Sequence, residues 1–148
     1  MEDKIHYDLQ LILAILGGRV SAALSSKLSR NFKSYNVDLT PDAWTALLYL
    51  WRQDGMTQQE LCRVTSRDKP AMTRLINAME RQGLVKRVCG ETDRRENHIH
   101  LTQLARDIEG KARFVGYKTL KEALRGLSQE ELKTAQNVLR RVFSNSKD

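Results

Sequence analysis

The residues best suited to chemistry in this chain lie on one predicted helix, from residue 70 to about residue 82. Apolar side chains recur along it at i, i+3, i+4 and i+7, which places them on one helical face: Met72, Leu75, Ile76 and Met79. The opposite face carries donors, cations and small groups and no carboxylate, namely Pro70, Thr73, Arg74, Asn77 and Arg81. Such a helix can bury one side and lay the other against an anionic, hydrogen-bonding surface, and the major groove of DNA is such a surface.

We expect five residues of this segment to face a major groove: Lys69, Pro70, Thr73, Arg74 and Asn77. An arginine can bond O6 and N7 of guanine together, and an asparagine can bond adenine in the same bidentate way. The alternative interpretation of Arg74 is an ordinary solvated cation on a helix surface.

A charged hairpin follows this helix. Residues 84–88 and 98–101 favour two strands, and residues 90–97 favour a polar loop between them. At its tip, Arg95 could enter a narrow A·T-rich minor groove, where the negative potential is enhanced. Asp93 could hold the Arg95 guanidinium as a charge-assisted pair, and Arg94 is either a phosphate contact or the alternative insertion residue.

Phosphate contacts give affinity without sequence information. The candidates are polar or cationic residues around the predicted helix and hairpin, namely Thr57, Arg63, Arg67, Lys86 and Arg87.

Local signals place these residues on a helical framework. The predicted helices are 7–32, with Gly17 and Gly18 inside it as a bend or a close approach, then 41–53, 57–64, 70–82, 102–124 and 128–143. Thr40, Asp68 and Thr102 are expected N-caps, and Thr57 with Glu60 and Ser128 with Glu131 match capping boxes. Gly83 and Gly126 are expected to end helices, and Met56 to lie in a very short strand.

Length and composition point to one soluble domain. The chain has 148 residues, of which 41% are hydrophobic and 29% charged, and its net charge of +7 favours an anionic partner. Much of the cationic excess lies outside residues 38–102. No apolar run approaches the 18 or so residues of a membrane span and no signal peptide is recognisable, so we expect a cytoplasmic protein that does not enter a membrane.

The long terminal helices need apolar partners that one small central unit cannot supply. A second copy, in a two-fold dimer, is the expected partner. Packing of the first helix against the last within one chain is the alternative.

In this order the motifs resemble the MarR family, the multiple-antibiotic-resistance repressors, which are bacterial winged-helix transcription regulators. The resemblance covers nearly the whole chain and rests on five short segments: Leu39-Thr40-Pro41 with Trp44, Thr57-Gln58-Gln59-Glu60-Leu61, residues 68–75, Gly83-Leu84-Val85, and Asp93-Arg94-Arg95 followed by Leu101-Thr102.

The resemblance implies a mainly α fold with a small β-wing. It implies a winged helix-turn-helix lobe at residues 39–102, flanked by dimerisation helices at residues 1–38 and 103–148, with about six helices and a two- or three-stranded sheet. It further implies a homodimer on a pseudo-palindromic operator, acting as a repressor released by a small phenolic or aromatic effector. Arg95 matches the family's signature wing arginine. Trp44, Leu48 and Trp51 are candidates to line the effector crevice, with core packing as their alternative role.

Fewer sequence features support the alternative functions. An enzyme is not expected, because no phosphate loop, nucleophile elbow or carboxylate dyad is recognisable, and no cofactor is expected. His98, His100 and Cys89 could bind zinc, although no established ligand spacing is present and no metal site is predicted. The remaining alternatives are a redox-responsive regulator sensing through Cys89 or Cys62, and a winged-helix protein-interaction adaptor.

Overall fold

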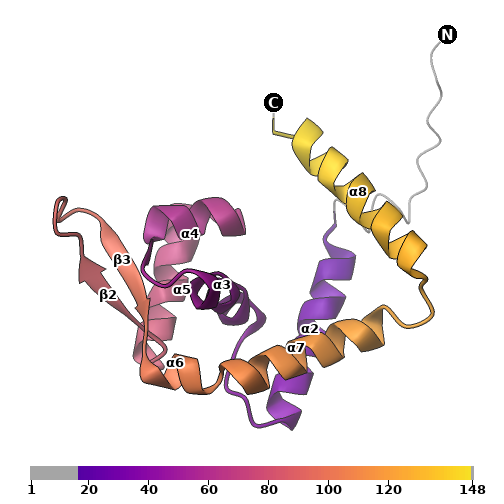
Figure 1. Ribbon diagram of the computed structural model, residues 1–148, viewed down its shortest axis with the longest axis horizontal. Coiled ribbons are helices and arrows are strands. Elements are labelled where there is room, and N and C mark those ends of the chain that lie inside the picture. Colours follow the sequence, from indigo (N-terminus) through magenta and orange to yellow (C-terminus); the bar gives the residue numbers. More distant parts are fainter. Residues whose placement is uncertain (1–16, 148) are drawn as a thin grey trace.

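The computed structural model describes residues 17–147 of the chain. This part forms seven helices and one three-stranded antiparallel sheet, which confirms the predicted mainly α fold with a small β-wing. In Figure 1 the sheet and the helices around it make a compact lobe on one side, and α2, α7 and α8 extend away from it on the other.

The first described helix, α2 (Arg19–Ser34), differs from the predicted helix 7–32. Gly18 has φ of +62° and stands just before the helix, so the glycine pair precedes a new helix instead of bending a continuous one. Glycine adopts this left-handed conformation without the steric cost that a Cβ would impose. Residues 7–16 of the prediction lie outside the described residues. Leu28 and Phe32 bury the inner face of α2.

The winged-helix lobe begins with α3 (Pro41–Arg52), β1 (Met56–Thr57), α4 (Gln58–Thr65) and α5 (Lys69–Arg81). The predicted caps are confirmed, because the side chains of Thr40, Thr57 and Asp68 each accept a hydrogen bond from the backbone three residues on. The Glu60 carboxylate returns a bond to the Thr57 backbone N–H at 2.8 Å, which completes the capping box.

The sheet adds β2 (Val85–Cys89) and β3 (Asn97–Leu101) in the order β1-β3-β2. Arg87 lies opposite Ile99, and Met56 lies opposite Ile99 from the other side. The core beneath the sheet is formed by side chains from α3, α4, α5 and β3 that are fully buried, among them Leu47, Leu50, Leu61, Met72, Ile76, Met79 and Ile99.

Three further helices lead away from the wing: α6 (Gln103–Asp107), α7 (Glu109–Ala123) and α8 (Gln129–Asn145). The single helix predicted over 102–124 is therefore two, separated at Ile108, whose ψ of −8° departs from helical geometry. Thr102 caps α6, and Ser128 with Glu131 forms the expected capping box of α8. Gly126, with φ of +85°, lies in the turn between α7 and α8.

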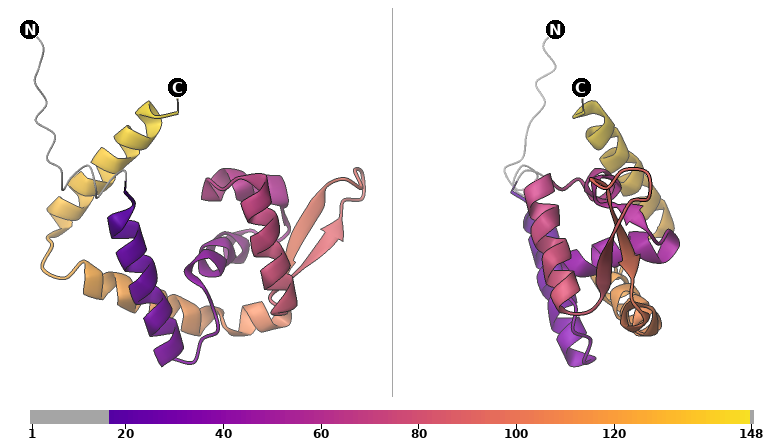
Figure 2. Two further views of the ribbon diagram at one scale, coloured as in Figure 1. Left: turned by 180° about the vertical axis from the view of Figure 1, so that it is seen from behind. Right: turned by 90° about the vertical axis from the view of Figure 1, so that its left-hand side faces the viewer.

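α2 crosses α7, as the two views of Figure 2 show. The Asn31 amide donates to the Thr119 hydroxyl at 2.8 Å, and Lys27 pairs with Glu122 at 3.1 Å. Hydrogen bonds from Lys118 and then Lys27 lower the pKa of Glu122 to about 2. The lowered pKa keeps this carboxylate ionised, and able to pair with Lys27 of α2, even at pH values where an ordinary glutamate would be protonated.

α7 also meets α3 at one close approach. A Cβ built on the buried Gly116 would lie 2.2 Å from Cζ2 of Trp44. The obstacle is a bulky ring packed against the core, so it cannot move aside at little cost.

We therefore expect Gly116→Ala to destabilise the protein by about 1–3 kcal/mol, measured as the free energy of unfolding in urea. Gly110→Ala in the same helix is the matched control, since a Cβ there meets nothing within 4 Å. It should be neutral or stabilising by about 0.5–1 kcal/mol, because alanine favours a helix interior. Equal stability of the two variants would contradict the proposed close approach.

Candidate nucleic-acid interface

The turn between α4 and α5 sets the direction of α5. Ser66 ends α4 with φ of +54°, and the Arg67 backbone N–H bonds the Cys62 carbonyl at 3.1 Å. Asp68 then caps α5, with its carboxylate 2.7 Å from the Ala71 nitrogen, and Pro70 occupies the first turn, where a missing N–H does least harm. The helix therefore starts at a fixed point beside α4.

The two faces of α5 divide as the sequence predicts. Met72, Ile76 and Met79 are fully buried. Among the five residues expected to face a groove, Thr73 is half-buried and the others are exposed: Lys69, Pro70, Arg74 and Asn77. The Thr73 hydroxyl accepts from the Gln58 amide of α4 at 2.8 Å. Nothing in the sequence predicts this contact, because it joins two helices through their tertiary packing.

The wing tip differs from the sequence expectation in one contact. The Asp93 carboxylate accepts from the backbone N–H of Arg95 at 2.9 Å, where a pair with the Arg95 guanidinium was expected. A short Asp side chain bonds the backbone two residues on more readily than a mobile side-chain end. Asp93 thereby shapes the loop, and the exposed side chains of Arg94 and Arg95 are left to solvent.

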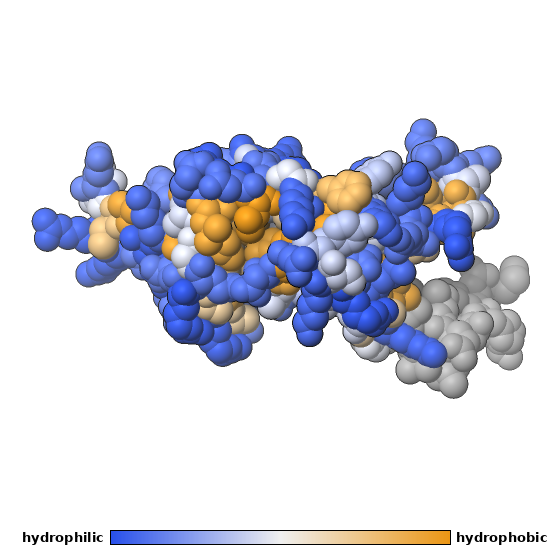
Figure 3. Space-filling model, turned by 90° about the horizontal axis from the view of Figure 1, so that it is seen from below, coloured by the Kyte–Doolittle hydropathy of each residue, from blue (hydrophilic) through white to orange (hydrophobic). Residues whose placement is uncertain are grey.

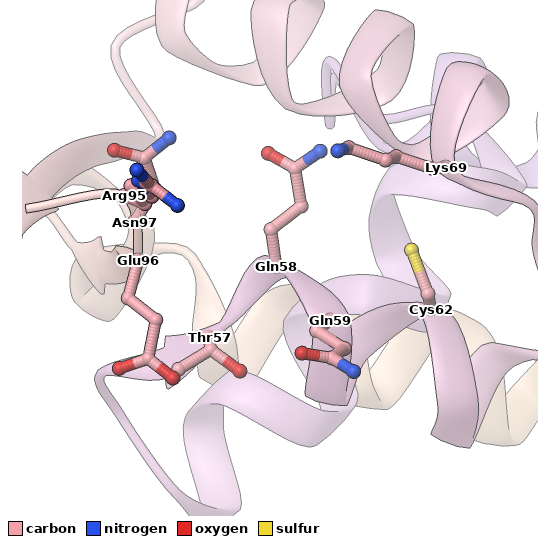
Figure 4. A pocket seen from close by; sticks show the side chains of 8 residues that line it. All are labelled: Thr57, Gln58, Gln59, Cys62, Lys69, Arg95, Glu96 and Asn97. Carbon is pink, nitrogen blue, oxygen red and sulfur yellow. The ribbon is translucent and has the colours of Figure 1, made fainter. Parts of the chain in front are cut away.

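A hollow of about 510 Å³ separates the start of α5 from the wing (Figure 4). Its lining comes from α4, α5 and the wing: Thr57, Gln58, Gln59, Cys62, Lys69, Arg95, Glu96 and Asn97. Lys69 lies at one side in Figure 4, and Arg95 and Asn97 lie at the other. Glu96 is the one carboxylate among these eight residues, so donors and cations dominate the hollow.

The candidate phosphate contacts fall into two groups. Arg63 and Lys86 are exposed, whereas Arg67 pairs with Asp42, and Arg87 pairs with Glu80 of α5. The Thr57 side chain is half-buried and caps α4. Pairing with a carboxylate neutralises the charge that a phosphate contact would use, so Arg67 and Arg87 are held within the lobe. The sequence did not single out Glu80.

The zinc alternative meets a geometric obstacle. In the hairpin, His98 lies opposite Val88 and His100 opposite Lys86, whereas Cys89 lies opposite Asn97. Because alternate residues of a strand point to opposite faces, Cys89 and the two histidines lie on different sides of the sheet. Across residues 17–147, no three His, Cys, Asp or Glu side chains come together as a metal site.

Of the three candidates for an effector crevice, the structure places one beside a large hollow. This hollow, of about 660 Å³, lies between α2, α3, α7 and α8, and Trp44, Leu24, Leu28, Leu120 and Leu139 contribute to its lining. Trp51 is elsewhere, with its indole N–H donating to the Ala105 carbonyl at 3.1 Å and the Arg113 guanidinium over its ring. Leu48 is half-buried and does not line this hollow.

This arrangement, with a capped helix exposed along one face beside a β-wing, defines a winged helix-turn-helix protein. Residues 37–96 match the model of the MarR family. The HTH-type transcriptional regulator YybA of Bacillus subtilis is 26% identical over 128 residues, which are 86% of this chain and 84% of that protein. The segment that matches the MarR model is the winged-helix lobe, and over most of its length the chain is similar to a transcriptional regulator.

Solved structures agree with this fold. The transcriptional regulator PA3341 is 29% identical, with a TM-score of 0.74 over 91% of this chain and 98% of that one. The S. aureus MepR–DNA complex is 23% identical, with a TM-score of 0.79 over 89% of this chain and 96% of that one. In the part of the chain that the structure describes, no helix is long and apolar enough to cross a membrane.

Proposed function

We propose that this chain binds double-stranded DNA sequence-specifically as a homodimer, with α5 in the major groove and the wing in the adjacent minor groove. The observation that carries the proposal is the donor-lined hollow between Lys69 of α5 and Arg95 of the wing. When one element enters each groove, a sugar–phosphate strand must pass between them, and a surface of donors and cations suits that strand. The MepR–DNA complex, which shares the fold, supports this role.

In this arrangement some side chains read bases and others contact phosphates. Arg74 and Asn77 read base edges from the exposed face of α5, and Arg95 enters the minor groove from the wing tip. Lys69, Arg63 and Lys86 neutralise phosphates. A symmetric dimer would bind a pseudo-palindrome with half-sites about one helical turn apart.

Arg74→Ala should weaken binding to a selected operator about 5- to 150-fold and relax base preference where Arg74 reads, as the loss of a bidentate contact does. Lys111→Ala on α7 is the matched control, because this exposed cation lies beside Gln82, at the other end of α5 from Lys69, and it should bind as the unaltered protein does. Fluorescence anisotropy at several salt concentrations measures both effects. An affinity that does not fall with salt would argue against phosphate contacts altogether.

The homodimer part of the proposal rests on α8. None of its residues is buried, although one side carries four large apolar residues that are 42–61% exposed: Val138, Leu139, Val142 and Phe143. The exposed apolar residues continue onto α7, including Phe114, Tyr117, Leu120 and Leu124. From below, the space-filling view likewise shows apolar areas between charged ones (Figure 3).

An exposed apolar surface as large as the one on α7 and α8 is typical of a protein–protein interface. A second copy of the chain has the same apolar stripes and can bury this surface. The segments that would make the dimer are residues 1–38 and 103–148, with residues 39–102 as the DNA-binding lobe. This division keeps the DNA contacts of each copy apart from the contacts between copies.

Val138→Glu combined with Val142→Glu should shift the protein from twice the 17.0 kDa chain mass towards a single chain, because a carboxylate buried without a partner is costly. Light scattering coupled to gel filtration measures the mass. Asn137→Glu, on the side of α8 that faces away from these apolar residues, is the control and should remain a dimer. A wild-type protein of single-chain mass would contradict this part of the proposal.

We further propose that the 660 Å³ hollow beside Trp44 admits a small aromatic or phenolic effector that releases the DNA, which would make the protein a repressor. The lining is mostly apolar, and its residues come from both the lobe and the terminal helices. An occupant could therefore change the orientation of the lobe relative to these helices. The Trp44 indole N–H is buried and has no hydrogen-bond partner among the described residues.

The chain has two tryptophans, which makes this site testable by fluorescence. With Trp51→Phe, the emission of Trp44 should change saturably when 4-hydroxybenzoate, a phenolic probe, is added. With Trp44→Phe, the remaining Trp51 lies outside the hollow and should show no saturable change. Equal responses of the two variants would argue against binding beside Trp44.

A further inference from the structure

We propose that Arg87 of the wing is a specificity-determining residue that acts through Asn77, by holding the amide of Asn77 so that it offers hydrogen-bond donors to the DNA. The inference deepens the proposed function and rests on it. It gives Arg87 a role other than the phosphate contact that the sequence indicated.

The contacts of Arg87 run along one side of α5. Its guanidinium pairs with the Glu80 carboxylate, donates to Oδ1 of Asn77 at 2.8 Å and lies 3.5 Å from the Thr73 carbonyl. The Arg87 backbone N–H also faces Glu80, at 3.4 Å. With 21% of its side chain exposed, Arg87 is held between strand β2 and helix α5.

The chemistry of the guanidinium fixes the orientation of the amide. Arginine has five N–H donors and no acceptor, so the atom of Asn77 that faces it must be the carbonyl oxygen. The NH₂ group of Asn77 therefore points away from Arg87. Asn77 is exposed on the face of α5 that we place in the major groove.

This orientation determines which base edges Asn77 can read. Bidentate bonding to adenine requires the amide to accept from N6 and donate to N7. With its oxygen turned to Arg87, Asn77 offers donors, and its targets are acceptors such as N7 and O6 of guanine or O4 of thymine. Glu80 supports the arrangement, because its carboxylate holds the guanidinium in place.

The test is selection of operators from random duplexes by the full-length protein, followed by affinity measurements on single-base variants. Asn77→Ala identifies the base position that Asn77 reads, as the one whose preference is lost. We expect the wild-type protein to prefer guanine or thymine to adenine at that position by at least about fivefold. Replacing a preferred purine with its 7-deaza analogue should weaken wild-type binding and leave Asn77→Ala binding unchanged.

Arg87→Met keeps an apolar stem and frees the amide of Asn77. We expect the preference at that one position to move towards adenine by at least about fivefold, while the other positions keep theirs. Arg87→Lys should retain the wild-type preference, since lysine is also a donor without an acceptor. Lys86→Met removes a proposed phosphate contact from the neighbouring residue of β2, so it should weaken binding to all sequences alike and leave base preference unchanged at every position.

A merely structural or phosphate-binding Arg87 gives a different result. In that case Arg87→Met would weaken binding to all sequences alike, with the preference at the Asn77 position intact, and the inference would be overturned. Glu80→Gln provides a second readout if Arg87→Met does not fold, and it should relax preference at the same position. A wild-type protein that selects no sequence overturns the proposed function and this inference together, whereas a selected motif indifferent to Arg87 and Glu80 overturns this inference only.

Discussion

One-sided burial of α5 is the constraint on which the rest of the lobe depends. Met72, Ile76 and Met79 have no exposed surface, and burial of each such side chain contributes roughly 1.5–3 kcal/mol to stability. An α-helix has a fixed angular step per residue, so fixing three inward positions fixes the outward ones as well. The direction of Arg74 and Asn77 is therefore set by the core on the opposite side of the helix.

Polar contacts position the wing together with the buried side chains of Val85, Ile99 and Leu101. Asp54, after α3, accepts from the Leu101 backbone at 2.8 Å and pairs with Arg106 of α6, also at 2.8 Å. Glu80 and Arg87 join α5 to β2 in the same manner. Exposed ion pairs add little stability, but they do fix geometry where two elements meet. In this lobe they determine the spacing between the exposed face of α5 and the wing tip.

The terminal helices meet the lobe through close packing instead of ion pairs. Gly116 allows the ring of Trp44 to approach the backbone of α7, and the Asn31–Thr119 hydrogen bond joins α2 to α7 nearby. The second hollow opens at this junction, beside Trp44. The proposed effector, bound in this hollow, would contact both α3 of the lobe and the helices α2, α7 and α8. The redox alternative through Cys62 or Cys89 stays a prediction; Cys89 is exposed and Cys62 is half-buried.

Much of the local structure could be predicted from the chain alone. The caps at Thr40, Thr57 and Asp68 depend on contacts within three residues, and the buried face of α5 follows from helical periodicity. Contacts between distant segments became known only from the tertiary structure. They are the partners of Arg87 and Thr73, the separation of Cys89 from the histidines, and the position of Trp51 outside the hollow. Spacing along the chain encodes which face a residue occupies, but it does not encode which distant side chain lies opposite, because that depends on how helices and strands pack together.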